Sequence, residues 1–203
     1  MKEVLTRIRE DLSMVVERDP SVGTRKEALL HPALLALWAH RVAHLLHTRG
    51  YRQSARSLAY VARAVTGGIE IHPAACLGRR VFIDHGAAVV IGETAEVGDD
   101  VTIFHQVTLG AIGWWRDNRR EPGSRRHPII GDRVVIGTNA ILLGPITVGD
   151  DALIGAGSLV LCDVPAGARM MAPAAEMLER RSADGRADWQ PPLRSLAKAA
   201  NSR

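Results

Sequence analysis

The chain has 203 residues, of which 24% are charged and only 4% aromatic, and its formal net charge at pH 7 is +4. This length allows one domain, or a small domain joined to a repeat array, with a buried core. The two cysteines, Cys76 and Cys162, form no spaced cluster, so they predict a reducing compartment without structural disulfides or a thiolate metal site. No signal peptide is evident, and no apolar run approaches the roughly 20 residues that span a bilayer. We therefore expect a cytoplasmic protein that does not contact a membrane.

The distribution of charge argues against nucleic acid as a partner. Residues 67–111 carry two arginines and six acidic residues, whereas residues 112–126 carry five arginines and two acidic residues. A short cationic segment of this kind suits a phosphorylated small molecule better than a DNA duplex.

The first 66 residues predict a helical region. Apolar residues at helical spacing form one stripe from Val4 to Val16 and a second from Leu34 to Leu46, and a third helix is expected from about Gln53 to Val65, ending at Gly67-Gly68. Between the first two helices, Arg18-Asp19-Pro20-Ser21 is a turn signal that places Asp19 at a helix boundary.

Three histidines, His40, His44 and His47, have the spacing i, i+4 and i+7 within the second predicted helix. This spacing could align metal ligands on one face. The carboxylate partner found in zinc proteases is missing nearby, so the pattern favours histidines that pack or face solvent, and we expect no metal.

From Ile71 to Val160 the sequence repeats every six residues. The first position of each hexad is aliphatic in all thirteen cases, and eight of them are followed directly by Gly. A period of six fits one short strand and one tight corner, and such repeats stack into a parallel β-helix. The thirteen positions are Ile71, Leu77, Ile83, Ile91, Val97, Ile103, Leu109, Ile130, Ile136, Leu142, Val148, Ile154 and Val160.

The residue four places after each hexad start is small or β-branched, Ala87 among them, and is expected to fill the rest of a narrow interior. Gly after the hexad start is expected to supply positive φ or a close backbone approach. The repeat slips by two residues between Val89 and Ile91 and breaks between Leu109 and Ile130. We predict an α+β chain with a helical domain over 1–66, a β-helix over 67–168 with an extruded loop at 111–128, and a C-terminal tail over 169–203 that is poorly ordered beyond about Glu179.

Three short segments contain ionisable residues that the repeat does not require: Glu70-Ile71-His72-Pro73, Ile83-Asp84-His85-Gly86 and Arg125-Arg126-His127-Pro128. Together with Arg18-Asp19-Pro20, Val90-Ile91-Gly92-Glu93-Thr94-Ala95 and Val107-Thr108-Leu109-Gly110, they closely resemble serine acetyltransferases over residues 17 to 168. The hexads alone indicate only a hexapeptide acyltransferase, and the left hand of the β-helix is implied by the resemblance.

An alkyl hydroxyl is a poor nucleophile at neutral pH, so acyl transfer from a thioester favours a base such as imidazole, whose ordinary pKa is about 6.5. His85 is the best candidate for this base. The resemblance implies that it removes the proton of the L-serine hydroxyl while that oxygen attacks acetyl-CoA, and that the carboxylate of Glu70 orients its ring. The alternative is a turn Asp-His pair on a solvated corner, and His72 and His105 receive no role.

The resemblance also implies how the two substrates bind. It assigns Asp19 and Asp84 to the ammonium group of the amino acid, and Arg126 with His127 to its carboxylate, which a guanidinium can bind with two hydrogen bonds. Coenzyme A is expected between neighbouring subunits of a trimer, with its narrow pantetheine arm passing Gly110, Thr138 and Ala156. Corners of the β-helix explain each of these three positions equally well.

The sequence departs from the family in several places. Glu70 stands where the family usually has Asp, and the loop after Gly110 is about seven residues longer than usual. Trp114, Trp115 and the loop arginines either cover coenzyme A phosphates, reshape the acceptor pocket, or form an exposed loop or subunit contact. The last residues, Asn201-Ser202-Arg203, lack the terminal Ile with which family members bind cysteine synthase, so we do not expect that complex, and a trimer is favoured over a dimer of trimers.

The sequence therefore predicts a serine O-acetyltransferase of cysteine biosynthesis, with acetyl-CoA as co-substrate. The alternatives are transfer to another hydroxy amino acid or specialised metabolite, a catalytically idle trimeric scaffold, and, ranked last, a carbonic anhydrase on the same fold. The last needs a close pair of zinc-binding histidines, which the β-helix histidines lack.

Overall fold

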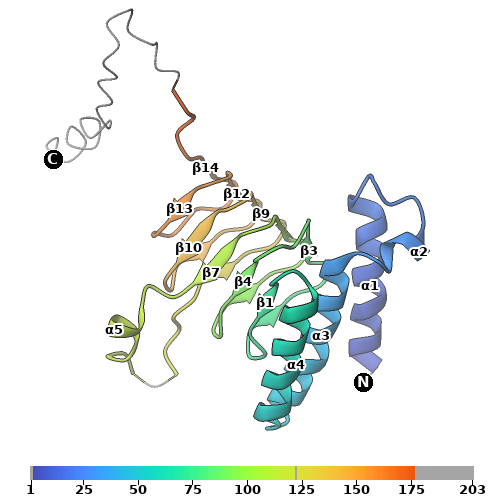
Figure 1. The fold of residues 1–203 in the computed structure, drawn as a ribbon. Helices are drawn as coiled ribbons and strands as arrows, with labels where there is room; N and C mark the ends of the chain where they lie inside the picture. The colour runs from blue at the N-terminus through green and yellow to red at the C-terminus, as the bar shows by residue number, and fades with distance from the viewer. Residues whose placement is uncertain (1, 122, 177–203) are drawn as a thin grey trace, which may run out of the picture. The chain divides into compact units, whose positions relative to one another are not determined.

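The computed structural model describes residues 2–121 and 123–176, and the residues up to Ala172 form one compact unit (Figure 1). Four helices come first: α1 (Lys2–Arg18), α2 (Arg25–Ala28), α3 (Pro32–Thr48) and α4 (Arg52–Val65). The apolar stripes predicted α1, α3 and α4, whereas the four-residue α2 was not predicted. The predictions for the tail beyond Glu179, including the terminal residues, lie outside the described residues. None of the described helices is both long and apolar enough to cross a membrane.

Residues 70–170 fold into a left-handed parallel β-helix, which confirms the predicted fold class. Within the described residues, the first sheet has the order β1-β4-β7-β10-β13, the second β11-β8-β5-β2 and the third β14-β12-β9-β6-β3, all with parallel pairing. The chain visits the three sheets in turn. The last strand ends at Met170, two residues past the predicted boundary of the repeat.

The strands are two or three residues long, as a period of six requires. Their bounds are β1 (Glu70–Ile71), β2 (Cys76–Leu77), β3 (Phe82–Ile83), β4 (Val90–Ile91), β5 (Glu96–Val97), β6 (Thr102–Ile103), β7 (Thr108–Gly110), β8 (Ile129–Ile130), β9 (Val135–Ile136), β10 (Ile141–Leu143), β11 (Thr147–Val148), β12 (Leu153–Ile154), β13 (Leu159–Val160) and β14 (Arg169–Met170), with the short helix α5 (Trp114–Asp117) in the loop between β7 and β8.

The core of the β-helix consists of the hexad positions. All thirteen aliphatic first residues are buried, and the small residues four places on complete the interior. The expectation for Ala87 is wrong: Ala87 is exposed, and Val89 is fully buried in its place. The two-residue slip of the repeat therefore lengthens the corner before β4 without changing the core.

The glycines after the hexad starts serve close packing between coils. A Cβ at Gly137 would lie 2.6 Å from the backbone nitrogen of Ala156 in the next coil. Positive φ instead falls three residues after the hexad start, and there the chain uses other residues as well, for example Asp100 with φ 58° and Asn139 with φ 57°. Of the two reasons expected for these glycines, close approach is the one that applies at Gly137.

The helices close one end of the β-helix. Helices α3 and α4 pack against β1, and α1 packs against β3. Arg41 of α3 is buried and donates hydrogen bonds to the carbonyl oxygens of Leu77 (2.8 Å) and Gly78 (2.8 Å). These bonds satisfy backbone carbonyls at the end of a strand that α3 covers.

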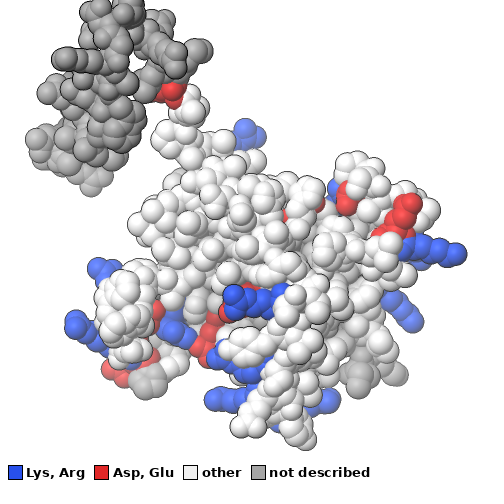
Figure 2. Space-filling model, viewed as in Figure 1, with Lys and Arg blue, Asp and Glu red and all other residues white. Residues whose placement is uncertain are grey.

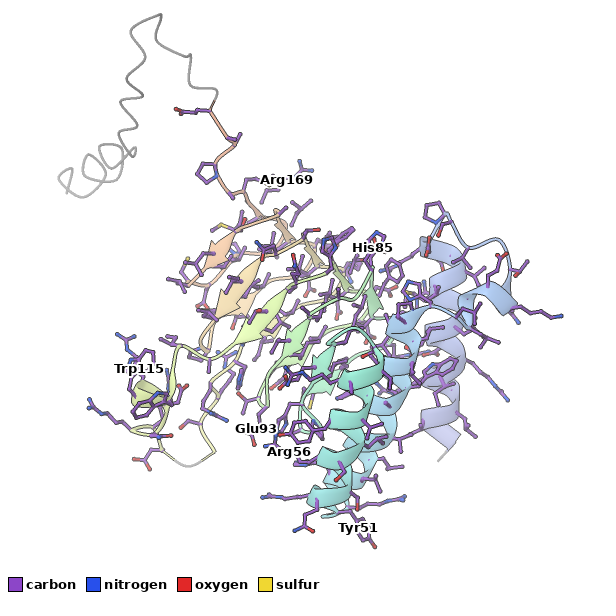
Figure 3. The ribbon with its side chains drawn as sticks, in the orientation of Figure 1. Tyr51, Arg56, His85, Glu93, Trp115 and Arg169 are labelled. Carbon is purple, nitrogen blue, oxygen red and sulfur yellow. The ribbon has the colours of Figure 1, made fainter. Side chains whose placement is uncertain are left out.

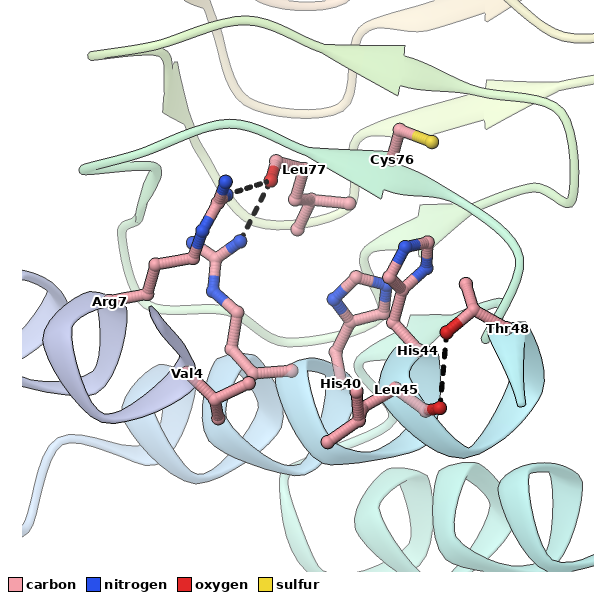
Figure 4. Close-up of a pocket in the computed structure, with 9 residues that line it drawn as sticks. Val4, Arg7, His40, His44, Leu45, Thr48, Cys76 and Leu77 are labelled. Carbon is pink, nitrogen blue, oxygen red and sulfur yellow. Dashed lines mark hydrogen bonds between the residues drawn. The ribbon is translucent and has the colours of Figure 1, made fainter. Parts of the chain in front are cut away.

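Two of the helix histidines take part in this packing. The ring nitrogen Nε2 of His40 lies 3.1 Å from the carbonyl oxygen of Ala75, and Nδ1 of His44 lies 2.9 Å from that of Pro73. Figure 4 shows both rings directed from α3 toward β2, in a hollow of about 360 Å³. Burial lowers the pKa of His40 to about 3, so its ring is neutral and hydrogen-bonds the first coil.

Candidate functional site

The candidate residues lie at two corners of the β-helix. We call the turns from the third sheet to the first the His85 corner, which contains His85 in its first turn, Thr138 in its third and Ala156 in its fourth. We call the turns from the first sheet to the second the His127 corner, which contains Gly110, Arg126, His127 and the loop at 111–128. In Figure 3, His85 lies beside the N-terminal helices, whereas Glu93 of the His127 corner lies near the loop that carries Trp115.

His85 has a strained backbone and an exposed ring. Its φ is 58°, and that of Gly86 is also 58°. A left-handed conformation is costly for a residue with a side chain, and the corners of this β-helix adopt it repeatedly, as at Asp100 and Asn139. The side chain is 74% exposed, and its Nε2 lies 3.8 Å from Oδ2 of Asp84. The ring thus projects from the lengthened corner with a carboxylate at one of its nitrogens.

Asp19 and Asp84 meet His85 in one cleft of about 450 Å³ between the α1–α2 turn and the first coil. The Asp19 carboxylate accepts hydrogen bonds through Oδ1 from the backbone nitrogen (2.9 Å) and hydroxyl (2.6 Å) of Ser21. These bonds lower the pKa of Asp19, so the cleft contains a fixed negative charge. The structure therefore brings together the two residues assigned to an ammonium group and the assigned base.

Arg18 explains why Asp19 is held at this cleft. Its Nη1 donates to the carbonyl oxygen of Asp100 (3.0 Å) and to Oγ1 of Thr102 (2.9 Å), and its Nη2 lies 2.8 Å from Oδ1 of Asp100. The end of α1 is thus fastened to the β-helix one residue before Asp19. A sequence turn signal indicated the helix boundary but not this attachment.

His31 also lines the cleft, and the sequence did not single it out. Its Nε2 lies 3.8 Å from Oδ2 of Asp19, and its ring packs against Phe82 with 5.9 Å between the centroids. Burial lowers the pKa of His31, so its neutral form faces Asp19. In the sequence it reads only as the residue before Pro32 at the start of a helix, a position that gives no signal of a binding site.

Glu70 does not reach His85 in this conformation. Its Oε2 lies 2.9 Å from Nη1 of Arg63 on α4, and within the described residues no hydrogen bond or ion pair joins it to His85. The preceding residue, Ile69, contacts the His85 corner, because a Cβ at Gly86 would lie 2.6 Å from its Cδ1. Glu70 is therefore near the corner, and its predicted role requires its carboxylate to leave Arg63.

Arg126 and His127 lie together at the other corner. Arg126 forms an ion pair with Glu93 through Nη2, and His127 is buried with its ring over Gly92, where any Cβ would overlap it. Burial and the neighbouring Arg126 lower the pKa of His127. Within one chain this pair is thus separated from His85 by the breadth of the first sheet.

The predicted coenzyme A positions are close-packed backbone sites. Gly110 accepts a hydrogen bond from the nitrogen of Gly144 (2.9 Å), and Thr138 accepts one from that of Gly157 (2.8 Å). Ala156 is exposed on the coil after Thr138. Thr138 and Ala156 continue the column that starts at His85, whereas Gly110 lies at the His127 corner, so one chain does not gather all three.

The loop at 111–128 protrudes from the His127 corner (Figure 1). Trp114 and Trp115 are exposed, while Asp117 is buried and its Oδ1 lies 3.3 Å from Nε of Arg120. Figure 2 shows charged side chains over this loop and over α4, on either side of a hollow, whereas the face over β10 and β13 is largely uncharged. Exposed apolar residues on that face are Ile141, Leu159 and Leu161.

Comparisons with known proteins show which family has this architecture. A family model described as bacterial transferase hexapeptide (six repeats) matches residues 127–162. The stacked hexads and the two corners define a hexapeptide-repeat acyltransferase. A serine acetyltransferase of Mycobacterium tuberculosis is 46% identical over 192 residues, which cover 93% of this chain and 80% of that protein. The chain belongs to the serine acetyltransferase family.

Solved structures agree with this placement. Serine acetyltransferase of Neisseria gonorrhoeae, in complex with serine, matches with a TM-score of 0.75 and 38% identity over 83% of this chain and 66% of that one. Serine acetyltransferase of Brucella abortus, in complex with coenzyme A, matches with a TM-score of 0.78 and 36% identity over 86% of this chain and 67% of that one. This chain spans about two thirds of each solved chain.

Proposed function

We propose that the protein transfers the acetyl group of acetyl-CoA to the hydroxyl of L-serine in the cytoplasm, as a step of cysteine biosynthesis, with His85 as the general base. The observation that carries the proposal is the cleft in which Asp19, Asp84 and His85 meet. Two carboxylates suit a substrate ammonium, and the imidazole suits proton removal from an alcohol.

We infer that Nε2 of His85 is the ring nitrogen that takes the proton. Because Oδ2 of Asp84 lies 3.8 Å from Nε2 of His85, an ammonium bound by Asp84 places the hydroxyl of a small amino acid beside the same nitrogen. Nε2 takes the hydroxyl proton as the oxygen attacks the thioester carbonyl. The new C–O bond forms, the C–S bond breaks, and the proton passes from Nε2 to the departing coenzyme A thiolate.

The other candidate residues complete the site from a second chain. Arg126 and His127 bind the serine carboxylate, yet they lie at a different corner from His85 in the same chain. A trimer in which the His127 corner of one chain faces the His85 corner of the next brings the two halves together. The uncharged face with Ile141, Leu159 and Leu161 supports such packing, because exposed apolar patches favour association.

Coenzyme A then lies between chains, along the column of Thr138 and Ala156 from one chain and past Gly110 of its neighbour. Small residues and backbone groups suit the narrow pantetheine arm. The residues present fit the cofactor in chemistry: Ala156 is exposed, and the loop at 112–126 carries arginines besides Arg126, such as Arg116 and Arg119, for phosphate groups.

The test is an acceptor panel assayed by release of free thiol from acetyl-CoA. L-Serine is expected to accelerate release most, and His85→Gln is expected to abolish the acceleration. Release that another hydroxy amino acid accelerates more than L-serine would favour the alternative acceptor, for which the Arg63-paired Glu70 and the long loop are the supporting observations. Release that no acceptor accelerates would contradict the proposed activity.

A further inference from the structure

Thr94 connects the two residues that are proposed to bind the substrate carboxylate. It lies in the second coil at the His127 corner, within the Gly92-Glu93-Thr94-Ala95 segment. Its Oγ1 accepts hydrogen bonds from the backbone nitrogens of Arg126 (2.8 Å) and His127 (3.1 Å). The same hydroxyl lies 2.9 Å from Nδ1 of His127. The Thr94 hydroxyl has two acceptor sites and one donor, and these three contacts occupy all of them.

These bonds fix the proton on the ring of His127. The backbone nitrogen of Thr94 lies 3.1 Å from Nδ1 of His127, and a backbone N–H can only donate. Nδ1 must therefore carry a lone pair, so the neutral ring carries its proton on Nε2. A proton on Nδ1 would point at the Thr94 N–H, so the hydrogen bonds exclude that tautomer.

The Nε2 edge of the buried His127 ring packs against Gly92 and is the edge that carries the proton. Cδ2 and Nε2 of His127 lie over Gly92, and within the described residues Nε2 has no protein hydrogen-bond partner. An N–H group in this position is a neutral donor suited to a carboxylate oxygen beside the Arg126 guanidinium. The loop at 111–128 also rejoins the β-helix here. The two hydrogen bonds to Thr94 Oγ1 therefore fix the backbone positions of Arg126 and His127.

We propose that Thr94 is a positioning residue: it holds the Arg126–His127 backbone where the chain re-enters the β-helix and keeps His127 as the Nε2–H tautomer that donates to the substrate carboxylate. The inference rests on the proposed function for the identity of the ligand. The tautomer of His127 and the anchoring of the Arg126–His127 backbone are inferred from the hydrogen bonds alone.

The experiment compares Thr94→Val, which keeps the shape and removes the hydroxyl, with Thr94→Ser, which keeps the hydroxyl. Thr48→Val is the matched control, because among the residues that the structure describes its Oγ1 bonds to the carbonyl of Leu45 at the end of α3 and to no other group. Unmade hydrogen bonds to two partly buried N–H groups predict a KM for L-serine raised about 10- to 100-fold in Thr94→Val. The KM for acetyl-CoA is expected to change less, and Thr94→Ser and Thr48→Val to stay within about threefold of the wild type.

The spectroscopic readout is the pair of ¹⁵N shifts of His127 in histidine-labelled protein, assigned by their loss in His127→Gln. The wild type is expected to show the Nε2–H tautomer, and Thr94→Val a mixture of tautomers. A wild-type spectrum with the proton on Nδ1, or Thr94→Val with wild-type kinetics and spectrum, would overturn the inference. If Thr94→Val does not fold, the wild-type spectrum and the Thr94→Ser kinetics still decide it. If the wild-type protein shows no serine-dependent thiol release, the proposed function is contradicted. The ¹⁵N spectrum of His127 would still test the tautomer independently.

Discussion

Replacing His85 by Gly separates the chemical role of its side chain from the free-energy cost of its backbone conformation. The left-handed backbone of His85, with φ 58°, costs a residue with a Cβ about 1–2 kcal/mol. Gly adopts this conformation freely but loses about 0.5–1 kcal/mol more conformational entropy on folding. The side chain is 74% exposed and its carboxylate partner is 3.8 Å away, so little packing or ion-pair energy is lost.

We therefore expect His85→Gly to stabilise the fold by about 0.5 to 1 kcal/mol, which corresponds to a rise of about 1 to 4 °C in the midpoint of thermal unfolding. The same change is expected to lower kcat about 10²- to 10⁴-fold, because the proposed general base is removed. A gain of stability together with a loss of kcat would separate the backbone strain of the corner from the chemistry of the His85 side chain.

The assay pairs thermal unfolding at one fixed protein concentration with thiol release under saturating substrates. Gln106→Gly is the control, since Gln106 is exposed in the next coil with φ 61° and is expected to stabilise similarly with kcat unchanged. A His85→Gly protein that keeps more than about a tenth of wild-type kcat would refute the role as base. A lowered midpoint would refute the strain argument.

Three further predictions address residues whose roles depend on tertiary contacts. Glu70→Gln is expected to lower kcat about tenfold if its carboxylate moves to His85, with Arg63→Ala leaving kcat equal or higher; wild-type kcat in both would show that Glu70 has no part. The unfolded pKa of His40 is near 6.5 and its folded pKa about 3, so the unfolded chain binds a proton that the native chain does not. His40 should therefore lower the free energy of unfolding by about 1.4 kcal/mol per pH unit as the pH drops from about 6.5 toward 3. In urea titrations at several pH values, the free energy of unfolding of His40→Asn should depend less steeply on pH than that of the wild type. Deleting residues 114–120 should raise the KM for acetyl-CoA several-fold; an unchanged value would leave the loop with another role.

The fold could be predicted because one period governs it. A hexad start must be apolar to lie inside a narrow prism, and each of the thirteen is buried. Handedness does not follow from spacing and came from the family resemblance. The prediction that Ala87 is buried was wrong because it kept the six-residue count across the two-residue slip. The buried residue is Val89. The period predicts the interior well only where it is unbroken.

The site was predicted in parts, for a different reason. Ionisable residues that the repeat does not need, such as His85 and Arg126, are visible in a sequence. Their partners are chosen by tertiary packing, which periodicity does not encode. Arg63 pairs with Glu70 only because α4 folds back onto β1, and His31 joins the cleft only because α3 begins beside the first coil.

The proposed base lies where the repeat is interrupted. The turns before β7 and β10 have four residues, whereas the turn before β4 has six, from Asp84 to Val89. The two extra residues, with left-handed conformations at His85, Gly86 and Ala88, let an imidazole project into the cleft while Val89 still fills the core. The longer corner thus presents the imidazole while the packed interior stays unaltered.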